Sequence, residues 1–364
     1  MEDPFITKKT NVIDIQKIQN LPIHLILCTE RTGSSLLNAI LNQSPEILAI
    51  SEELFALYLY PKYHKKVHYT ESEIKTLVRE FVNLSEKNLK MFFSDISVFE
   101  KNVQAFRNYL PYPLLIRLIY WHFFDVKDKS HLKVIVDKQI KFLYYIKEVL
   151  RLFPDSKYII LTRDVRVNVL IRKKRNLHPN ADLVYMAGIW NDTYKSVPFL
   201  FQKVPNERIL IVHYEDLIQH AEKTVETICR FLEVRYFPEM LEFQKTYKKF
   251  IEIKRPLVGE IYYQQMLDFN SDLLKPITPD KIGLWKKELS IAQIQKIATI
   301  CGKTAKYLQY DLYTQGTASL TLSDKWQLLK ARFYRYWFLK FYLKIPLSVK
   351  ILIKGIRGKT SCSF

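Results

Sequence analysis

Between residues 22 and 232, short apolar runs alternate with stretches in which apolar residues recur every three or four positions. Residues 23–27 have the length of a buried strand, and the apolar residues of 36–41 recur at helical spacing. Similar short runs at 132–137, 157–162 and 209–212 are each followed by a helical pattern. This alternation predicts an α/β fold with a parallel sheet flanked by helices.

Three further parts lie outside this alternating pattern. Residues 1–20 are polar and are predicted to lead into a main domain of 21–322. Within that domain, 60–130 is mostly helical in pattern and is broken at Leu110-Pro111-Tyr112-Pro113. It is predicted to be a helical insertion that either forms the walls of an acceptor pocket or serves packing alone. Residues 323–364 form a basic tail rich in aromatic residues, with the pattern of an amphipathic helix.

The turn between the first strand and its helix is the most informative stretch. A strand, a tight loop and a helix in this order place free backbone N–H groups at a helix N-terminus, where the helix dipole favours an anion. Gly33 can take backbone angles closed to other residues. The nucleotide triphosphatase loop G-x-x-x-x-G-K-[ST] does not fit, because Cys28 replaces its first glycine and Ser34 its lysine. The loop is therefore predicted to bind an oxyanion, and a serine-rich turn without a ligand is the alternative.

Composition adds a preference for anionic partners. The 364 residues carry 56 Lys+Arg against 37 Asp+Glu, a net charge of +19, and the hydrophobic content of 48% is that of a folded globule. No nucleic-acid recognition motif accompanies this charge, so nucleic acid is not the expected partner. The four cysteines are far apart in sequence, which favours reduced thiols over disulfides or a metal site. The first residues lack the apolar core of a secretory signal, and the sequence predicts a cytoplasmic protein.

Cations at equivalent strand ends indicate the charge of the expected ligand. Arg31, Lys138 and Arg163 each lie at or just after the end of a predicted strand, and ligands of parallel sheets bind at those ends. Their convergence predicts one polyanionic ligand. On the helix after Arg163, Arg172 and Arg175 share roughly one face with Asn168, either as part of that site or as a solvated basic face.

Two adjacent carboxylates follow another apolar run. Glu52 and Glu53 come directly after Ser51. They are either an acidic pair at a helix N-terminus capped by Ser51, or a general base that faces the anion loop. Their spacing does not decide between the two.

Four segments in order resemble the sulfotransferases that use 3'-phosphoadenosine 5'-phosphosulfate (PAPS), and the bacterial and tyrosylprotein members more than the small-molecule branch. R-T-G-S-S-L-L at 31–37 is similar to the family's R-S-G-T-T-L-L loop, and FPDSKYIILTRDVR at 153–166 to its FPDAKFI-x-x-x-RDPR strand. VHYEDL followed by RFLEV, and KPI followed by IGLWKKELS, are similar to its R-Y-E-D-L…FL-G segment and its C-terminal loop. The resemblance covers about 22–313 and implies a P-loop-type fold, transfer of a sulfuryl group to a hydroxyl, and no metal.

The resemblance also implies roles for individual residues. The 5'-phosphosulfate would be held by Arg31, Thr32, Gly33, Ser34, Ser35 and Leu36, the 3'-phosphate by Arg163 and Arg175, and the nucleotide site would be lined by Tyr214, Ser271 and Lys275. Lys138 would stabilise the leaving oxygen, and Glu53 or Glu52 would take the acceptor's proton. The family's serine on the helix after the RDPR arginine is Ile171 here, so one 3'-phosphate contact is missing.

The tail suggests what else the protein binds. From Lys325 onward, Trp, Phe, Tyr and Leu alternate with Lys and Arg, a pattern typical of helices that bind anionic membrane surfaces. A helix that packs on the body with a solvated basic face would have the same sequence pattern. We therefore expect a small-molecule or lipid acceptor and an enzyme peripheral to the membrane. The second hypothesis is a non-catalytic basic protein that binds anionic membranes or nucleotides.

Overall fold

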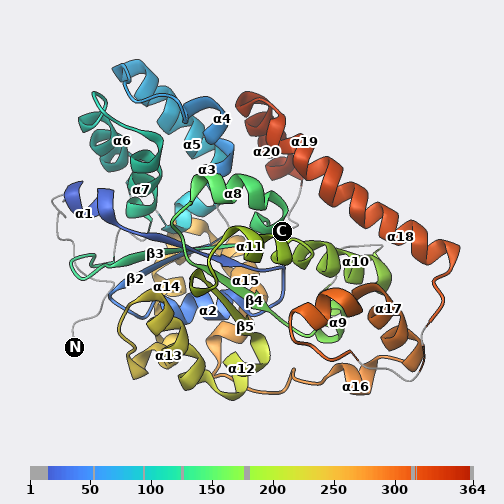
Figure 1. Cartoon of the computed structure of the whole chain (residues 1–364). Coiled ribbons are helices and arrows are strands. Elements are labelled where there is room, and N and C mark those ends of the chain that lie inside the picture. Colours follow the sequence, from blue (N-terminus) through green and yellow to red (C-terminus); the bar gives the residue numbers. More distant parts are fainter. Residues whose placement is uncertain are drawn as a thin grey trace.

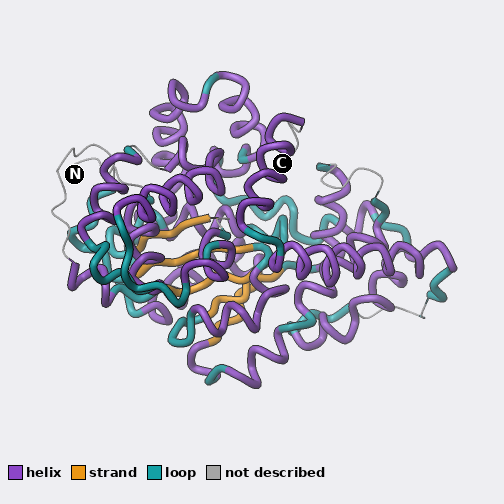
Figure 2. Tube along the Cα trace, turned by 90° about the horizontal axis from the view of Figure 1, so that it is seen from above, coloured by secondary structure: helices purple, strands orange, loops and turns teal. Residues whose placement is uncertain are grey.

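Five parallel strands form the centre of the molecule. The computed structural model describes residues 15–51, 54–92, 95–123, 127–175, 181–312, 316 and 318–360. The strands are β1 (Ile23–Leu27), β2 (Ile47–Ser51), β3 (Val134–Gln139), β4 (Tyr158–Thr162) and β5 (Ile209–His213), in the order β2-β3-β1-β4-β5. Every neighbouring pair is parallel, and helices surround the sheet (Figures 1 and 2). The predicted α/β fold is confirmed.

Alternation along the strands divides the core into two layers. In β1, Leu25 and Leu27 point to one face of the sheet and Ile26 to the other, and all three are fully buried. The first face is covered by α7 (Tyr112–His122), α8 (Ile146–Leu152) and α10 (Leu183–Tyr194). The second is covered by α2 (Ser34–Leu41) and α13 (Ala221–Leu232). Burial on both faces explains why the strands read as continuous apolar runs.

The described part of 60–130 is mostly helical, as its pattern predicts. It contains α4 (Tyr60–Tyr63), α5 (Glu71–Phe92) and α6 (Ile96–Ala105), and α3 (Phe55–Tyr58) precedes it. Pro111 is the N-cap of α7, which is where a proline is tolerated and where the pattern breaks. The predicted lead-in includes a helix: α1 (Ile15–Asn20) packs against α7 and buries Ile18 completely.

Further helices complete the chain after β4. They are α9 (Val165–Lys174), α11 (Val197–Lys203), α12 (Tyr214–Gln219), α14 (Phe243–Val258), α15 (Glu260–Phe269), α16 (Trp285–Glu288) and α17 (Ile291–Tyr307). Short 3-10 turns are η1 (Phe142–Tyr145), η2 (Asn206–Arg208), η3 (Pro238–Glu242) and η4 (Ser271–Leu274). The helical pattern that follows the run 132–137 thus begins as the 3-10 turn η1 before α8.

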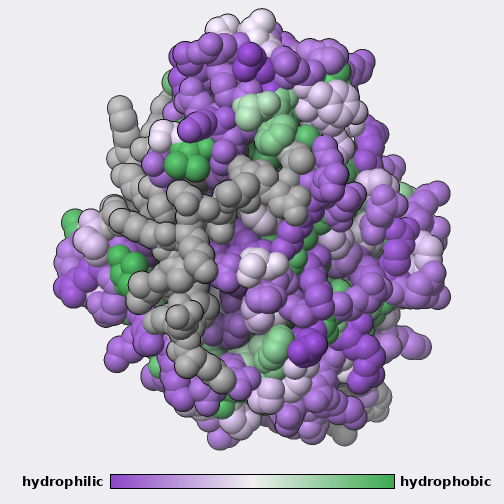
Figure 3. All heavy atoms as spheres, turned by 90° about the vertical axis from the view of Figure 1, so that its left-hand side faces the viewer, coloured by the Kyte–Doolittle hydropathy of each residue, from purple (hydrophilic) through white to green (hydrophobic). Residues whose placement is uncertain are grey.

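The described part of the tail is mostly helical and lies against the body. It consists of α18 (Leu322–Arg332), the π-helical η5 (Phe333–Phe338), α19 (Leu339–Lys344) and α20 (Leu347–Thr360). Helix α18 packs against α10 (Figure 1). The face at the left of Figure 1 is largely hydrophilic, with small separate hydrophobic areas (Figure 3). Within the described ranges, no helix combines the length and the apolar character needed to cross a bilayer.

Candidate functional site

The loop after β1 takes a conformation suited to an oxyanion. Arg31 has a φ of 62° and Gly33 a φ of 82°, so the chain turns twice through the left-handed region before α2 begins at Ser34. The side chain of Thr32 is buried, and its Oγ1 donates a hydrogen bond to the Thr29 carbonyl at 2.9 Å. The first N–H groups of a helix have no partner within it, so those at Ser34, Ser35 and Leu36 suit an oxyanion.

Gly33 is required at its position for a second reason. A Cβ atom built on Gly33 would lie 2.4 Å from Cδ2 of Tyr214, the first residue of α12. The tyrosine ring therefore packs directly on the loop backbone. Since Tyr214 follows β5 and Gly33 follows β1, this contact joins two strand ends that are separated by β4 in the sheet.

Arg163, which follows β4, lies between these two strand ends. Its Nη1 donates a hydrogen bond to the Arg31 carbonyl at 3.2 Å, and its guanidinium carbon lies 3.8 Å from the ring centroid of Tyr214. The residue is only 4% exposed. Within the described part of the chain, its Nε and Nη2 are buried and have no hydrogen-bond partner. Burial lowers the pKa of this guanidinium.

Helix α10 fixes the backbone beneath these cations. The hydroxyl of Tyr194 donates to the Leu161 carbonyl at 2.7 Å and accepts from the Thr29 N–H at 3.2 Å. The indole of Trp190 donates to the Arg163 carbonyl at 3.2 Å. Both aromatic side chains are fully buried, so the ends of β1 and β4 are held by rigid groups.

Arg175 and Ser271 form a second group of residues near Arg31. Arg175 donates from Nη1 to the Asp268 carbonyl at 2.9 Å and from Nη2 to Ser271 Oγ at 3.4 Å. Burial lowers the pKa of Arg31, and the charge of Arg175 lowers it further. The charge of Arg163 lowers the pKa of Arg31 as well, so Arg31 is repelled by both cations, as expected for cations arranged around an anion. Lys275 follows η4 and is exposed.

Lys138 lies within β3 rather than after it, and β3 extends one residue further to Gln139. Its side chain is 1% exposed, and the residue pairs in register with Ile26 of β1 and Ser51 of β2. The two carboxylates that follow Ser51, Glu52 and Glu53, lie outside the described residues, so their role as a base stays a prediction.

The face of α9 that points toward the loop was only partly interpreted from sequence. Asn168 Nδ2 donates to the Glu30 carbonyl at 2.8 Å, and Arg172 Nη2 donates to the Glu30 carboxylate at 2.8 Å. Arg172 is fully buried. The i, i+4 spacing of Asn168 and Arg172 was the available signal, but the sequence could not show that both bind the residue before Arg31.

Helix α9 also holds the segment with the pattern IGLWKKELS. The guanidinium carbon of Arg166 lies 3.8 Å from the ring centroid of Trp285, and Arg166 forms a 2.7 Å ion pair with Asp164. Lys174 pairs with Glu288 at 2.5 Å. The contacts of Arg166 with Trp285 and of Lys174 with Glu288 are not predictable from local spacing, because more than a hundred residues separate the partners.

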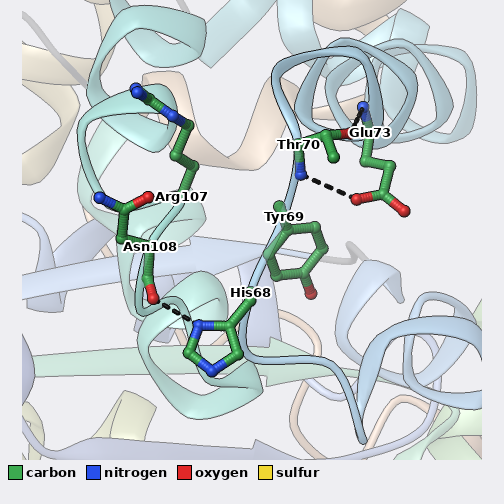
Figure 4. A pocket seen from close by; sticks show the side chains of 6 residues that line it. All are labelled: His68, Tyr69, Thr70, Glu73, Arg107 and Asn108. Atoms are coloured by element: carbon green, nitrogen blue, oxygen red, sulfur yellow. Dashed lines mark hydrogen bonds between the residues drawn. The ribbon is translucent and has the colours of Figure 1, made fainter.

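A separate hollow lies in the helical insertion (Figure 4). It is lined by His68, Tyr69, Thr70, Glu73, Arg107 and Asn108. The polar groups there bond to one another: Thr70 N–H donates to Glu73 at 2.8 Å, and the His68 ring bonds the Asn108 carbonyl at 2.6 Å. None of the predicted site residues lines it.

With this geometry described, the chain can be compared with known proteins. Residues 22–239 match the model of the Sulfotransferase family, and the chain belongs to that family. It is 24% identical over 168 residues to protein-tyrosine sulfotransferase 2 of Gallus gallus, covering 45% of this chain and 43% of that one. It is 23% identical over 176 residues to protein-tyrosine sulfotransferase 1 of Danio rerio, covering 47% and 46%. These matches span less than half of each relative.

Two solved structures have a similar fold. The sulfotransferase domain from the curacin biosynthetic pathway superposes with a TM-score of 0.53 at 17% identity, covering 80% of this chain and 99% of that one. The sulfotransferase domain of the Synechococcus PCC 7002 olefin synthase gives a TM-score of 0.50 at 18% identity, covering 80% and 96%. The predicted family resemblance is confirmed.

Proposed function

We propose that the protein transfers the sulfuryl group of PAPS to a hydroxyl of an acceptor, with release of 3'-phosphoadenosine 5'-phosphate (PAP). The observation that carries the proposal is the position of Arg163. This buried cation touches the loop 31–36, stacks on Tyr214, and keeps two buried N–H donors that no described residue satisfies. Buried donors of this kind need a partner, and a phosphate supplies one.

The remaining site residues would each bind a different part of PAPS. The N–H groups at the start of α2, with Arg31, would hold the 5'-phosphosulfate. Arg163 and Arg175 would bind the 3'-phosphate, and Tyr214, Ser271 and Lys275 would line the nucleotide. Ile171 is buried and offers no hydroxyl, so the arginines alone would neutralise the 3'-phosphate.

The chemistry follows from this placement. The bond between sulfur and the bridging phosphate oxygen breaks, and a bond forms between sulfur and the acceptor oxygen. Lys138 stabilises the negative charge on the leaving phosphate oxygen, and Glu53 or Glu52 takes the hydroxyl proton. Fixed N–H donors and buried cations act throughout, because the charge is spread over the sulfuryl oxygens in the transition state.

The acceptor that we propose is a small molecule or a lipid held at a membrane surface. The basic tail supports the membrane-associated form, because an enzyme docked on a bilayer meets acceptors in the same plane. A non-catalytic protein that binds anionic membranes or nucleotides is the second candidate, and the same basic tail favours it.

The test is transfer of label. The protein is incubated with ³⁵S-labelled PAPS and a cell lysate separated into a lipid extract and an aqueous fraction. The proposal predicts a labelled product that is absent with the Lys138→Met variant, and a lipid acceptor predicts label in the organic extract. Binding of PAP without a labelled product in either fraction would favour the non-catalytic candidate.

A further inference from the structure

Residues 322–344 of the tail form one continuous helix with two different faces. From Leu322 to Lys344 the helical segments α18, η5 and α19 follow one another without a break (Figure 1). Residues spaced by three or four lie on one side of a helix. Two such series run along the tail: 324, 328, 331, 335 and 339 on one side, and 322, 326, 329, 333, 337 and 341 on the other.

The first series fixes the tail to the body. Asp324 forms a 2.8 Å ion pair with Lys296 of α17. A Cβ atom on Gly188 of α10 would lie 2.8 Å from Leu328 Cδ2, so the two helices are in close contact. The Leu339 carbonyl accepts a 2.8 Å hydrogen bond from the hydroxyl of Tyr145.

Arg335 is the most deeply placed cation of this inner face. It is buried, and its guanidinium carbon lies 4.5 Å from the ring centroid of Tyr144. These contacts orient the tail rigidly. The outer series is therefore exposed because the opposite face of the helix packs on the body, and not because the helix is detached.

The second series is strongly apolar and faces solvent. Trp326 is 57% exposed, Phe333 63%, Trp337 71% and Phe341 67%. Leu322 and Leu329 are exposed along the same line. Among the exposed large hydrophobic residues of the described chain, this continuous line stands apart from the scattered positions elsewhere, and such patches mark interaction sites.

Cations accompany the apolar line, and acids do not. Exposed lysines and arginines flank it at Lys325, Lys330, Arg332, Lys340 and Lys344. The sequence from 322 to 353 contains one acidic residue, Asp324, which is buried on the inner face. Lys330 Nζ lies 5.7 Å from the Trp326 ring, so cation and aromatic group share one surface. The charge therefore complements an anionic partner.

We infer that this outer tail face (322, 326, 329, 333, 337 and 341, with its flanking cations) docks on an anionic lipid bilayer. Indole and phenyl rings bind at the boundary between headgroups and acyl chains, and lysine stems reach from there to the lipid phosphates. A bilayer can bind both the apolar line and its flanking cations, and it can do so along the full length of the helix. The inference stands independently of sulfuryl transfer.

The test uses the full-length protein and vesicle flotation. We expect it to float with phosphatidylcholine vesicles that contain phosphatidylserine at low salt, and to release at high salt because the charges are screened. The triple substitution Trp326→Ser, Phe333→Ser and Trp337→Ser should lower the partition coefficient roughly tenfold or more. The triple substitution Lys325→Gln, Lys330→Gln and Lys340→Gln should lower it by a similar factor at low salt.

Matched controls distinguish binding through this face from nonspecific hydrophobic binding to vesicles. Tyr109, Ile261 and Ile291 are exposed hydrophobic residues outside the tail, and their triple serine variant should float like the wild type. Unchanged circular dichroism and melting temperature would show that the tail variants fold. The inference is overturned if the wild type fails to float, if it binds pure phosphatidylcholine equally well, or if the tail and control variants lose binding alike. Tighter binding to a nucleic-acid homopolymer, unaffected by the aromatic substitutions, would also overturn it.

Discussion

The guanidinium of Arg163 lies 3.8 Å from the ring centroid of Tyr214 and donates a hydrogen bond to the Arg31 carbonyl. The ends of β1, β4 and β5 thereby meet around one buried cation. The contact also explains why the loop contains glycine, since the same tyrosine ring covers Gly33. A substitution at any one of these residues should therefore disturb the contacts of the others.

Replacing Gly33 with alanine should damage both the fold and the site. The φ of 82° is unfavourable for alanine, and the new Cβ would meet the Tyr214 ring at 2.4 Å. We expect the free energy of unfolding to fall by about 1–3 kcal/mol, measured by urea denaturation. Gly302→Ala is the control, because nothing lies within 4 Å of its Cβ position inside α17; it should be neutral or stabilise by up to about 1 kcal/mol. A harmless Gly33→Ala would show that the loop can adopt another conformation.

The ion pair between Glu30 and Arg172 should contribute to stability. Arg172 is fully buried, so Glu30→Gln removes a charged partner from a cation that water cannot reach. A double-mutant cycle with Arg172→Met should give a coupling free energy of about 1–2 kcal/mol. The exposed pair Lys245–Glu242 has the same 2.8 Å distance and should give less than about 0.5 kcal/mol. Equal couplings for the two pairs would mean that burial does not strengthen the inner pair.

Stability should fall in mild acid because of His24. Burial, followed by the charge of Lys157, lowers the pKa of His24 from 6.5 to about 4. Between these values the unfolded chain binds a proton at His24 and the folded chain does not, so the free energy of unfolding decreases as the pH falls, by up to about 3 kcal/mol.

The variant His24→Asn isolates this effect. An amide oxygen can replace Nδ1 as the acceptor of the 3.2 Å hydrogen bond from the Lys157 N–H. Its unfolding free energy should therefore depend less on pH between 6.5 and 4, whereas the exposed His131→Asn should retain the wild-type slope. Identical slopes for all three proteins would contradict the account.

The base should be one of two adjacent carboxylates. If Glu53 takes the acceptor's proton, Glu53→Gln should lower turnover roughly 10²–10⁴-fold while PAP binding is unchanged. Glu52→Gln should then be mild, because adjacent side chains point in different directions. An inactive Glu52→Gln would exchange the two roles. Near-normal turnover of both variants would mean that the pair is a helix cap.

Sequence patterns predicted the sheet well because most of its strands are buried on both faces and have the pattern of a short apolar run. They also predicted that Arg31 and Arg163 lie together, since both follow parallel strands. They did not predict the pairing of Glu30 with Arg172 or of Arg166 with Trp285, which depends on how α9 and α16 rotate against their neighbours. For the tail, the sequence patterns did not decide between packing on the body and membrane binding. The structure shows that one face packs on the body. The amphipathic pattern alone could not show this, because it does not tell what each face contacts.

The central claim is that Arg163 belongs to a donor site, and calorimetric titration with PAP tests it most directly. Lysine keeps the charge of Arg163 but loses the planar stacking on Tyr214 and the additional N–H donors. We predict that the wild type binds PAP more tightly than ATP with magnesium. Arg163→Lys should weaken PAP binding roughly 10–100-fold, and the exposed Arg255→Lys should not change it. No heat from the wild type at millimolar PAP, tighter binding of ATP, or equal PAP affinity in Arg163→Lys would contradict the account.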